Sequence, residues 1–315
     1  MPRPPGLRPP VLILAALAMA ATVMLVVLLV AGGEEEGSRP AAPAAPTRPP
    51  GPPSPDAVLP VTPQLLAAEV TQTTRALRMA IDAWTAEGNP LRERPPENLV
   101  LLAMHQQRLA FAMNGQPRLG DRTLALLPAD VRDEAADTVA ARRALADIPE
   151  GDPDDDGGGD EPEPPPIRTG PPEPPDLLRE HYDAAAERFD VRWELLAAVN
   201  LVESGFGRLR NSSVAGAQGP MQFIPATWEA YGMGGEIDDP RDAILGAANY
   251  LSASGAPEDQ EGALFAYNRS TSYGEAVSRH AGAIDRDPRH FYALYAWQVY
   301  VAGPDGTKRI TGPGL

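Results

Sequence analysis

Apolar residues form one continuous run near the start of the chain and then recur at helical spacing. Residues 11–31 are apolar apart from Thr22, and a helix needs about 20 such residues to span a bilayer. Farther along, Leu66, Val70 and Leu77 fall on one side of an expected helix. The C-terminal half has no clear alternation typical of strands, although short hairpins would fit within residues 206–219. The pattern predicts a mainly α protein.

The charges on either side of the apolar run predict its orientation. Arg3 and Arg8 precede it and glutamates at 34–36 follow it, so the positive-inside rule places the N-terminus in the cytoplasm. A cleaved signal peptide is the alternative, but its apolar region is usually about 7–15 residues long. We expect a cytoplasmic tail over 1–10, a transmembrane helix over 11–31, and the rest of the chain on the cell-wall side of the cell membrane.

Two segments have the composition of disordered linkers. Residues 32–60 are rich in proline and alanine, and residues 148–166 are rich in aspartate, glutamate, proline and glycine. Neither has enough apolar surface to form a core. The chain is therefore expected to consist of two folded regions, 61–147 and 167–315, joined by an acidic linker and preceded by a spacer.

The acidic linker contains a spacing that resembles a calcium-binding loop. Asp152, Asp154, Asp156 and Glu163 stand at positions that ligate Ca²⁺ in EF-hand loops. Prolines surround the motif, however, and no helical pattern flanks it. We interpret the segment as a solvated linker and expect neither a metal nor a cofactor.

Residues 61–147 are expected to form a small helical block. The pattern predicts three helices: one between Thr62 and Gly88, one beginning near Pro96, and one from Pro128 to Leu145. A lone histidine in the second helix, His105, is more typical of a structural role than of catalysis. The block shows no recognisable chemistry and the sequence does not predict its role, although its surface is a candidate contact for other cell-wall proteins.

Residues 167–315 are expected to form a second helical domain. Asp190 and Asp239 are candidate N-caps. Predicted helices cover 177–189, 191–203, 225–231, 240–254, a segment from Pro257 through Asn268, 273–284 and 288–300.

Composition and charge exclude several functions. The chain has no cysteine, which excludes disulfides, thiolate catalysis and cysteine-based metal sites. Its net charge is −16, and it has no basic patch to neutralise phosphates, so nucleic acid is not an expected partner.

Glu203 is the strongest candidate for a catalytic residue. It ends the expected helix 191–203 and shares a face with Leu196 and Val199. A carboxyl group in apolar surroundings has a raised pKa, as a general acid near neutral pH requires. A glutamate at a helix end can equally have a purely structural role, so the spacing alone does not establish catalysis.

Two downstream motifs, taken together with Glu203-Ser204, favour a catalytic role of Glu203 over a structural one. Residues 219–227 read Gly-Pro-Met-Gln-Phe-Ile-Pro-Ala-Thr, and residues 266–268 read Ala-Tyr-Asn. In this order the three motifs resemble the lytic transglycosylase domain of the goose-type-lysozyme-like (SLT) superfamily, over about residues 178–300. The arrangement of anchor, spacer, helical block and catalytic domain further resembles membrane-anchored actinobacterial members. One departure is Pro220, where many members carry leucine.

The resemblance implies a lysozyme-like α domain that cleaves peptidoglycan glycan strands. Glu203 would act as the sole acid/base, and its product would carry a 1,6-anhydro-MurNAc end. Tyr267 would stabilise the transition state or orient Glu203. The residues expected to contact or position the substrate are Ser204, Met221, Gln222, Phe223, Asn268 and Tyr273.

Two alternatives remain open. A lysozyme-type hydrolase needs a second carboxylate near the first, and the candidates are Glu229, Glu236, Asp238, Asp239 and Asp242. A non-catalytic protein that binds peptidoglycan is the other alternative.

Overall fold

The computed structural model of the chain describes residues 52–148, 166–213, 215–301 and 307–315. Within these ranges no helix is both long enough and apolar enough to cross a bilayer. The expected transmembrane helix at 11–31 and the calcium-like motif at 152–163 both lie outside the described residues.

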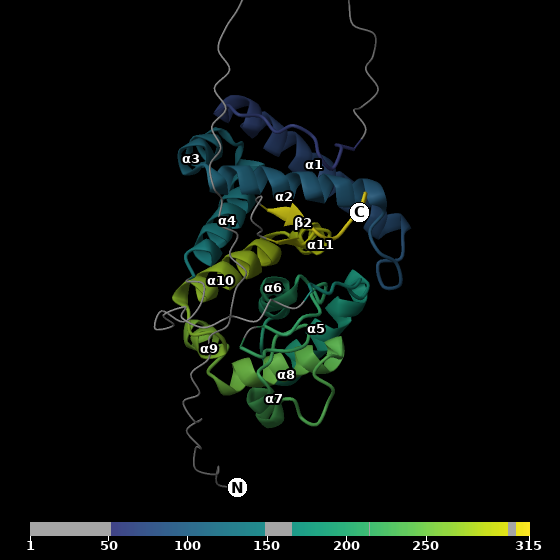
Figure 1. Cartoon of the computed structure of the whole chain (residues 1–315), viewed down its shortest axis with the longest axis vertical. Helices are drawn as coiled ribbons and strands as arrows, with labels where there is room; N and C mark the ends of the chain where they lie inside the picture. The colour runs from purple at the N-terminus through teal and green to yellow at the C-terminus, as the bar shows by residue number, and fades with distance from the viewer. Residues whose placement is uncertain (1–51, 149–165, 214, 302–306) are drawn as a thin grey trace, which may run out of the picture.

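The described part of the chain is mainly helical, as the pattern predicts, and its first region contains four helices (Figure 1). They are α1 (Pro63–Glu87), α2 (Glu97–Gly115), α3 (Pro117–Leu126) and α4 (Ala129–Ala146). Thr62 caps α1 as expected, since its hydroxyl accepts a hydrogen bond from the Leu65 amide at 3.4 Å. The prediction of three helices missed α3. This helix is only 10 residues long and contains Gly120, and it contributes just two partly buried leucines, Leu119 and Leu124, to the core of the block.

The second region is built around one helix that is buried on nearly all sides. The elements are α5 (Pro175–Phe189), α6 (Trp193–Ser204), α7 (Pro225–Tyr231), α8 (Pro240–Ala253), α9 (Gln260–Tyr267), α10 (Thr271–Arg286), α11 (Arg289–Tyr295), β1 (Tyr300–Val301) and β2 (Lys308–Arg309). Helix α6 packs against α5, α8, α10 and α11. Residues 196–200 of α6 are completely buried, because neighbouring helices cover both its apolar stripe and its flanks.

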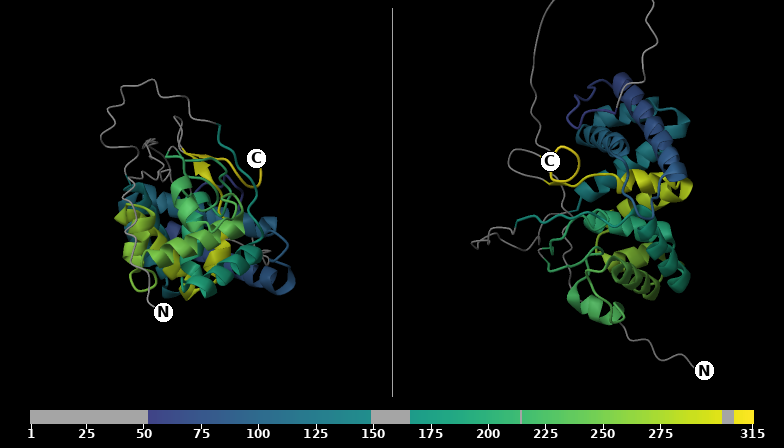
Figure 2. Two further views of the ribbon diagram at one scale, coloured as in Figure 1. Left: turned by 90° about the horizontal axis from the view of Figure 1, so that it is seen from below. Right: turned by 90° about the vertical axis from the view of Figure 1, so that its right-hand side faces the viewer.

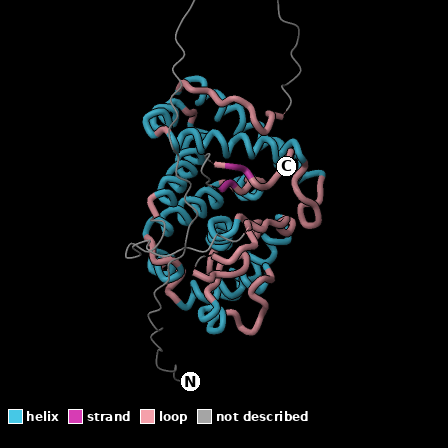
Figure 3. Tube along the Cα trace, in the orientation of Figure 1, coloured by secondary structure: helices cyan, strands magenta, loops and turns pink. Residues whose placement is uncertain are grey.

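Several predicted boundaries in this region are wrong. Asp190 does not cap α6: it ends α5 in the left-handed conformation, with φ of 55°. Helix α9 begins after its N-cap Asp259 rather than at Pro257. The last predicted helix, 288–300, ends at Tyr295, and Tyr300 instead pairs with Arg309 in the two-stranded hairpin. Figure 3 shows this hairpin as the magenta strands in the middle of the molecule.

The first region lies directly against the second (Figure 2). Helix α4 packs on α10, and α1 packs on α11. A shared hydrophobic cluster joins Leu77 and Ile81 of α1 to Ala293 of α11. Glu203 lies in the last turn of α6. This turn contacts the loop before α7 and the first turn of α10, and the last residue of α9 contacts the same loop.

Candidate active site

Glu203 lies in the last turn of α6, where the chain reverses sharply. Gly205 ends the helix with φ of 60°, and Phe206 and Gly207 follow with φ of 63° and 79°. The Phe206 amide donates to the Asn200 carbonyl at 3.1 Å, and the Gly205 amide donates to Leu201 at 2.9 Å. These are the backbone bonds that commonly close a helix C-terminus. Glu203 is part-buried at this end of the helix.

Burial raises the pKa of Glu203 from its ordinary value of 4.5 to about 7. The hydrogen bond from Tyr273 acts in the opposite direction, because it stabilises the charged carboxylate. The carbonyl-rich end of α6 also disfavours a negative charge. The sequence predicts a raised pKa, and a value near neutral pH allows one carboxyl group both to donate and to accept a proton.

The raised pKa predicts a pH-dependent cost to folding. Folded Glu203 retains its proton up to about pH 7, whereas the unfolded chain loses it near pH 4.5. Stability therefore falls as pH rises through this window. We expect the unfolding free energy of Glu203→Gln, relative to that of the wild type, to increase by about 3 kcal/mol between pH 4.5 and pH 8. Urea unfolding at both pH values measures this gain, and a difference that stays constant with pH would contradict it.

Ser204 connects the end of α6 to the glycine-rich loop. Its side chain is fully buried, and its hydroxyl donates to the Pro220 carbonyl at 2.5 Å and accepts from the Gly207 amide at 2.8 Å. The sequence assigned Ser204 to the positioning of substrate or of Glu203. In this structure its hydroxyl is occupied by internal partners, so it acts on the loop and not at the surface.

The glycine-rich loop is a tight hairpin whose position is set from two sides. Gln218 and Phe223 pair with each other through both backbone hydrogen bonds, at 2.9 and 2.8 Å. The Tyr267 hydroxyl donates to the Met221 carbonyl at 2.7 Å. Three residues of this loop were predicted to contact substrate. The side chains of Met221 and Phe223 are buried, so only Gln222, which is part-buried, has surface that a substrate could reach.

The hydroxyl that contacts Glu203 comes from Tyr273. It donates to Glu203 Oε1 at 2.6 Å, whereas the Tyr267 hydroxyl binds the loop as described above. The two phenol rings stack, with centroids 6.4 Å apart and planes 5° from parallel. The resemblance implied that Tyr267 either stabilises the transition state or orients Glu203. The observed contact gives the orienting position to Tyr273. Asn268, directly after α9, is buried, and its backbone amide donates to the Leu264 carbonyl.

Removing the Tyr273 hydroxyl is expected to raise the pKa of Glu203 further. Tyr273→Phe keeps the ring and its packing but deletes the donor that stabilises the carboxylate. The midpoint of the Glu203 titration, followed by carbon-13 NMR of labelled glutamate, should move up by about one pH unit. Tyr267→Phe is the matched control, because its hydroxyl binds Met221. An equal shift in both variants would contradict the assignment.

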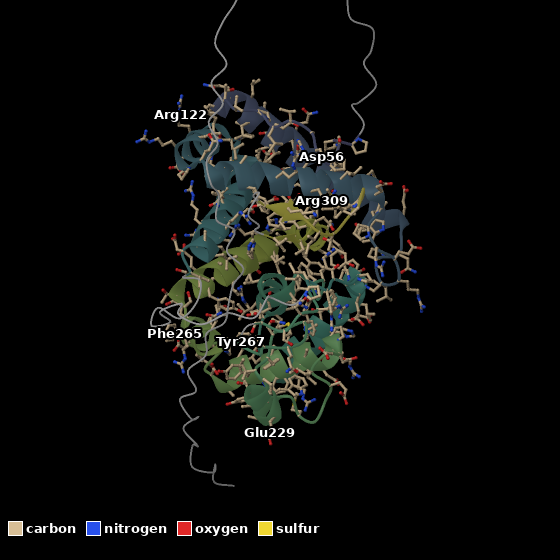
Figure 4. The ribbon with its side chains drawn as sticks, viewed as in Figure 1. Asp56, Arg122, Glu229, Phe265, Tyr267 and Arg309 are labelled. Atoms are coloured by element: carbon tan, nitrogen blue, oxygen red, sulfur yellow. The ribbon has the colours of Figure 1, made fainter. Side chains whose placement is uncertain are left out.

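A row of tyrosines extends away from Glu203, and sequence reasoning missed part of it. Tyr250 lies 5.6 Å from Tyr267, and Tyr231 lies 4.7 Å from Tyr250, measured between ring centroids. These rings come from α7, α8 and α9, so no spacing along the chain connects them. Figure 4 shows Tyr267 inward of Phe265, which stands at the outer edge of the molecule. A continuous row of aromatic rings next to a carboxyl with a raised pKa suits binding of a sugar chain.

The five acidic residues considered as a second carboxylate are exposed or bind backbone amides near α8. Asp239 caps α8 by accepting from the Asp242 amide at 3.0 Å, as its position before Pro240 predicts, and Asp242 accepts from the Glu236 amide at 3.0 Å. Glu229 and Asp238 are exposed, and Glu229 stands at the lower tip of the molecule, away from α6 (Figure 4). Among the described residues, no cluster of three acidic or histidine side chains is arranged to hold a metal ion.

Comparison with known proteins agrees with this geometry. Residues 180–287 match the family model described as "Transglycosylase SLT domain". Over 130 residues the chain is 33% identical to "Membrane-bound lytic murein transglycosylase F" of Thiobacillus denitrificans (strain ATCC 25259 / T1). That alignment covers 39% of this chain and only 27% of the relative. No solved structure matches the chain. The matched segment contains Glu203, the glycine-rich loop and all three of Tyr267, Asn268 and Tyr273, so the candidate site lies in the part of the chain that is similar to the transglycosylase SLT domain family.

Proposed function

We propose that this protein is a peptidoglycan lytic transglycosylase that cleaves MurNAc–GlcNAc β-1,4 bonds. The observation that carries the proposal is a single part-buried carboxyl, Glu203, whose pKa is raised to about 7. Family membership of residues 180–287 supports the same activity. A carboxyl that is neutral in an appreciable fraction of molecules at neutral pH can protonate a glycosidic oxygen.

The proposed reaction uses Glu203 twice. Protonated Glu203 donates its proton to the oxygen that links MurNAc to GlcNAc, and the bond between this oxygen and the MurNAc C1 breaks. The resulting carboxylate then takes the proton of the MurNAc 6-hydroxyl as that oxygen bonds to C1. The 1,6-anhydro ring closes, Glu203 regains its proton, and no water is consumed.

Tyr273 and Tyr267 have different parts in this reaction. The Tyr273 hydroxyl, 2.6 Å from Glu203 Oε1, stabilises the carboxylate that exists between the two proton transfers. Tyr267 holds the glycine-rich loop through Met221, and its ring borders the row of tyrosines. We assign Gln222, Tyr250 and Tyr231 to the binding of the glycan. Sugars commonly bind to aromatic faces with nearby hydrogen-bonding groups, which supports this assignment.

A lysozyme-type hydrolase is the nearest alternative. It would need a second carboxylate about 5–9.5 Å from the first to act as nucleophile or to activate water. The five acidic candidates are exposed or bind backbone amides near α8. Their placement favours the transglycosylase.

The membrane location of the enzyme is also a proposal. The apolar run at 11–31 and its flanking charges support a single transmembrane helix with the catalytic domain on the cell-wall side. The name of the similar protein describes that protein as membrane-bound. Peptidoglycan lies on this side of the membrane, so the anchor would hold the enzyme near its substrate.

Products formed in water enriched in oxygen-18 test the proposed function. The full chain is incubated with purified peptidoglycan, and the soluble muropeptides are weighed by mass spectrometry. A transglycosylase gives anhydro ends without oxygen-18, because the attacking oxygen belongs to the sugar. Reducing ends labelled with oxygen-18 would establish a hydrolase. Binding to peptidoglycan with no soluble product would support a non-catalytic role.

A further inference from the structure

The family match begins at residue 180, so it leaves the helical block of residues 61–147 without an assigned role. The most extensive packing of this block against the second region is between α4 and α10, and α10 is the helix that carries Tyr273. The structure therefore connects the block to the catalytic carboxyl through one helix.

Helix α10 lies between α4 on one side and α6 on the other (Figure 1). Tyr273, Val277 and Ile284 face the core that contains α6. Ala276, one turn after Tyr273, is fully buried against Ala141 and Ala144 of α4. Alanines at all three positions let the two helix backbones approach closely, so a larger side chain there would move α10 relative to α6.

Ion pairs also join α4 to the C-terminal half of α10. The carboxylate of Asp137 on α4 accepts hydrogen bonds from Arg279, at 3.1 Å, and from Arg286. The Asp137 side chain is only 15% exposed, whereas both arginines are about half exposed. One part-buried carboxylate thus holds two positions on α10 that are two turns apart.

The amino-acid sequence of α10 makes it dependent on such support. Gly274 and Gly282 lie inside the helix, and each lowers helix stability by about 1 kcal/mol relative to alanine. Both glycines line an open groove of about 450 Å³ between α4, α9 and α10. This third side of α10 is uncovered, and the most extensive contacts of the helix are with α4 and α6.

The geometry points to α4 as a positioning element of the active site: its packing on α10 holds the Tyr273 hydroxyl against Glu203. The catalytic unit then includes the helical block, although the block contributes no group that touches the substrate. This inference rests on the proposed function for its catalytic meaning, but the Tyr273–Glu203 contact can be measured without any activity.

The test compares substitutions on α4 with matched substitutions elsewhere in the block, all in the full chain. Ala141→Leu separates α4 from α10, and Asp137→Asn removes the ionic contact. Ala67→Leu is the control for the first, because Ala67 belongs to a cluster formed by block residues alone. Asp121→Asn is the control for the second, because Asp121 pairs with Arg143 inside the block.

The main readout is the titration midpoint of Glu203 by carbon-13 NMR, with Glu203→Gln used to assign the signal. Ala141→Leu and Asp137→Asn should raise this midpoint in the same direction as Tyr273→Phe, and Ala67→Leu and Asp121→Asn should leave it unchanged. For Ala141→Leu we also expect anhydro-product formation to fall by about 10²-fold, the effect of misplacing a catalytic contact by about 1 Å.

Three outcomes decide the question. Lower melting temperatures with an unchanged Glu203 midpoint in both α4 variants would overturn the inference, since α4 would then support only the fold. If Ala141→Leu does not fold, Asp137→Asn decides alone, because it changes charge and not volume. If the wild-type protein forms no anhydro product, the proposed function fails, while the NMR midpoints still establish or refute the positioning role.

Discussion

Glu203→Gln is expected to lower the rate of anhydro-product formation by about 10³-fold, within the range that general acid–base catalysis contributes. Glutamine keeps the shape of the side chain and can still accept the hydrogen bond from Tyr273. It cannot donate a proton to the glycosidic oxygen or take one from the 6-hydroxyl. The rate is measured from the anhydro muropeptides released over time from purified peptidoglycan.

A matched control separates this effect from a general disturbance of α6. Glu194→Gln makes the same substitution in the first turn of the same helix, and it should leave the rate unchanged. A Glu203→Gln rate within about tenfold of the wild type would exclude Glu203 as the sole acid/base.

Gly219→Ala should cause the largest loss of stability from a single methyl group near the site. Gly219 has φ of 73°, and an added Cβ would lie 2.0 Å from the Ile237 carbonyl oxygen. The left-handed conformation and the backbone clash together should cost about 3 kcal/mol. Because the loop carries Pro220 and Met221, the partners of Ser204 and Tyr267, product formation should fall as well.

Gly216→Ala is the control for the loop substitution. Gly216 has φ of 81°, but an added Cβ meets nothing within 4 Å. The variant should lose only the conformational cost of about 1–2 kcal/mol. Urea unfolding measures both losses, and equal losses would show that the contact with Ile237 is unimportant.

Local features of the site were predictable from the sequence because neighbouring residues determine them. The apolar pattern of residues 191–203 is enough to place Glu203 at the end of a buried helix and to predict a raised pKa. Asp239 before Pro240 is enough to predict an N-cap. The motifs at 219–227 and 266–268 pointed to segments of the site only through their resemblance, in this order with Glu203-Ser204, to the SLT superfamily.

Features that depend on how helices cross were not predictable. Tyr273 and Glu203 are 70 positions apart, and only the packing of α10 on α6 decides that Tyr273, and not Tyr267, reaches the carboxylate. Tyr231 and Tyr250 join the site through the packing of α7 and α8 in the same way. Helix α3 was missed because it is only 10 residues long and has Gly120 in its interior. Asp190 was misassigned because an aspartate can also end a helix in the left-handed conformation.

The contacts between the helical block and the rest of the protein also set an order of assembly. Gln107 of α2 exchanges two hydrogen bonds with Gln298, 191 positions later, and Asp82 of α1 pairs with Arg289, 207 positions later. The block is therefore synthesised long before the segments that it contacts, and such long-range contacts form slowly. Glu203 leaves the ribosome well before Tyr273, and α10 obtains its support from α4 only when the chain folds back. A partly synthesised chain would thus have Glu203 without its hydroxyl partner until the whole unit has folded.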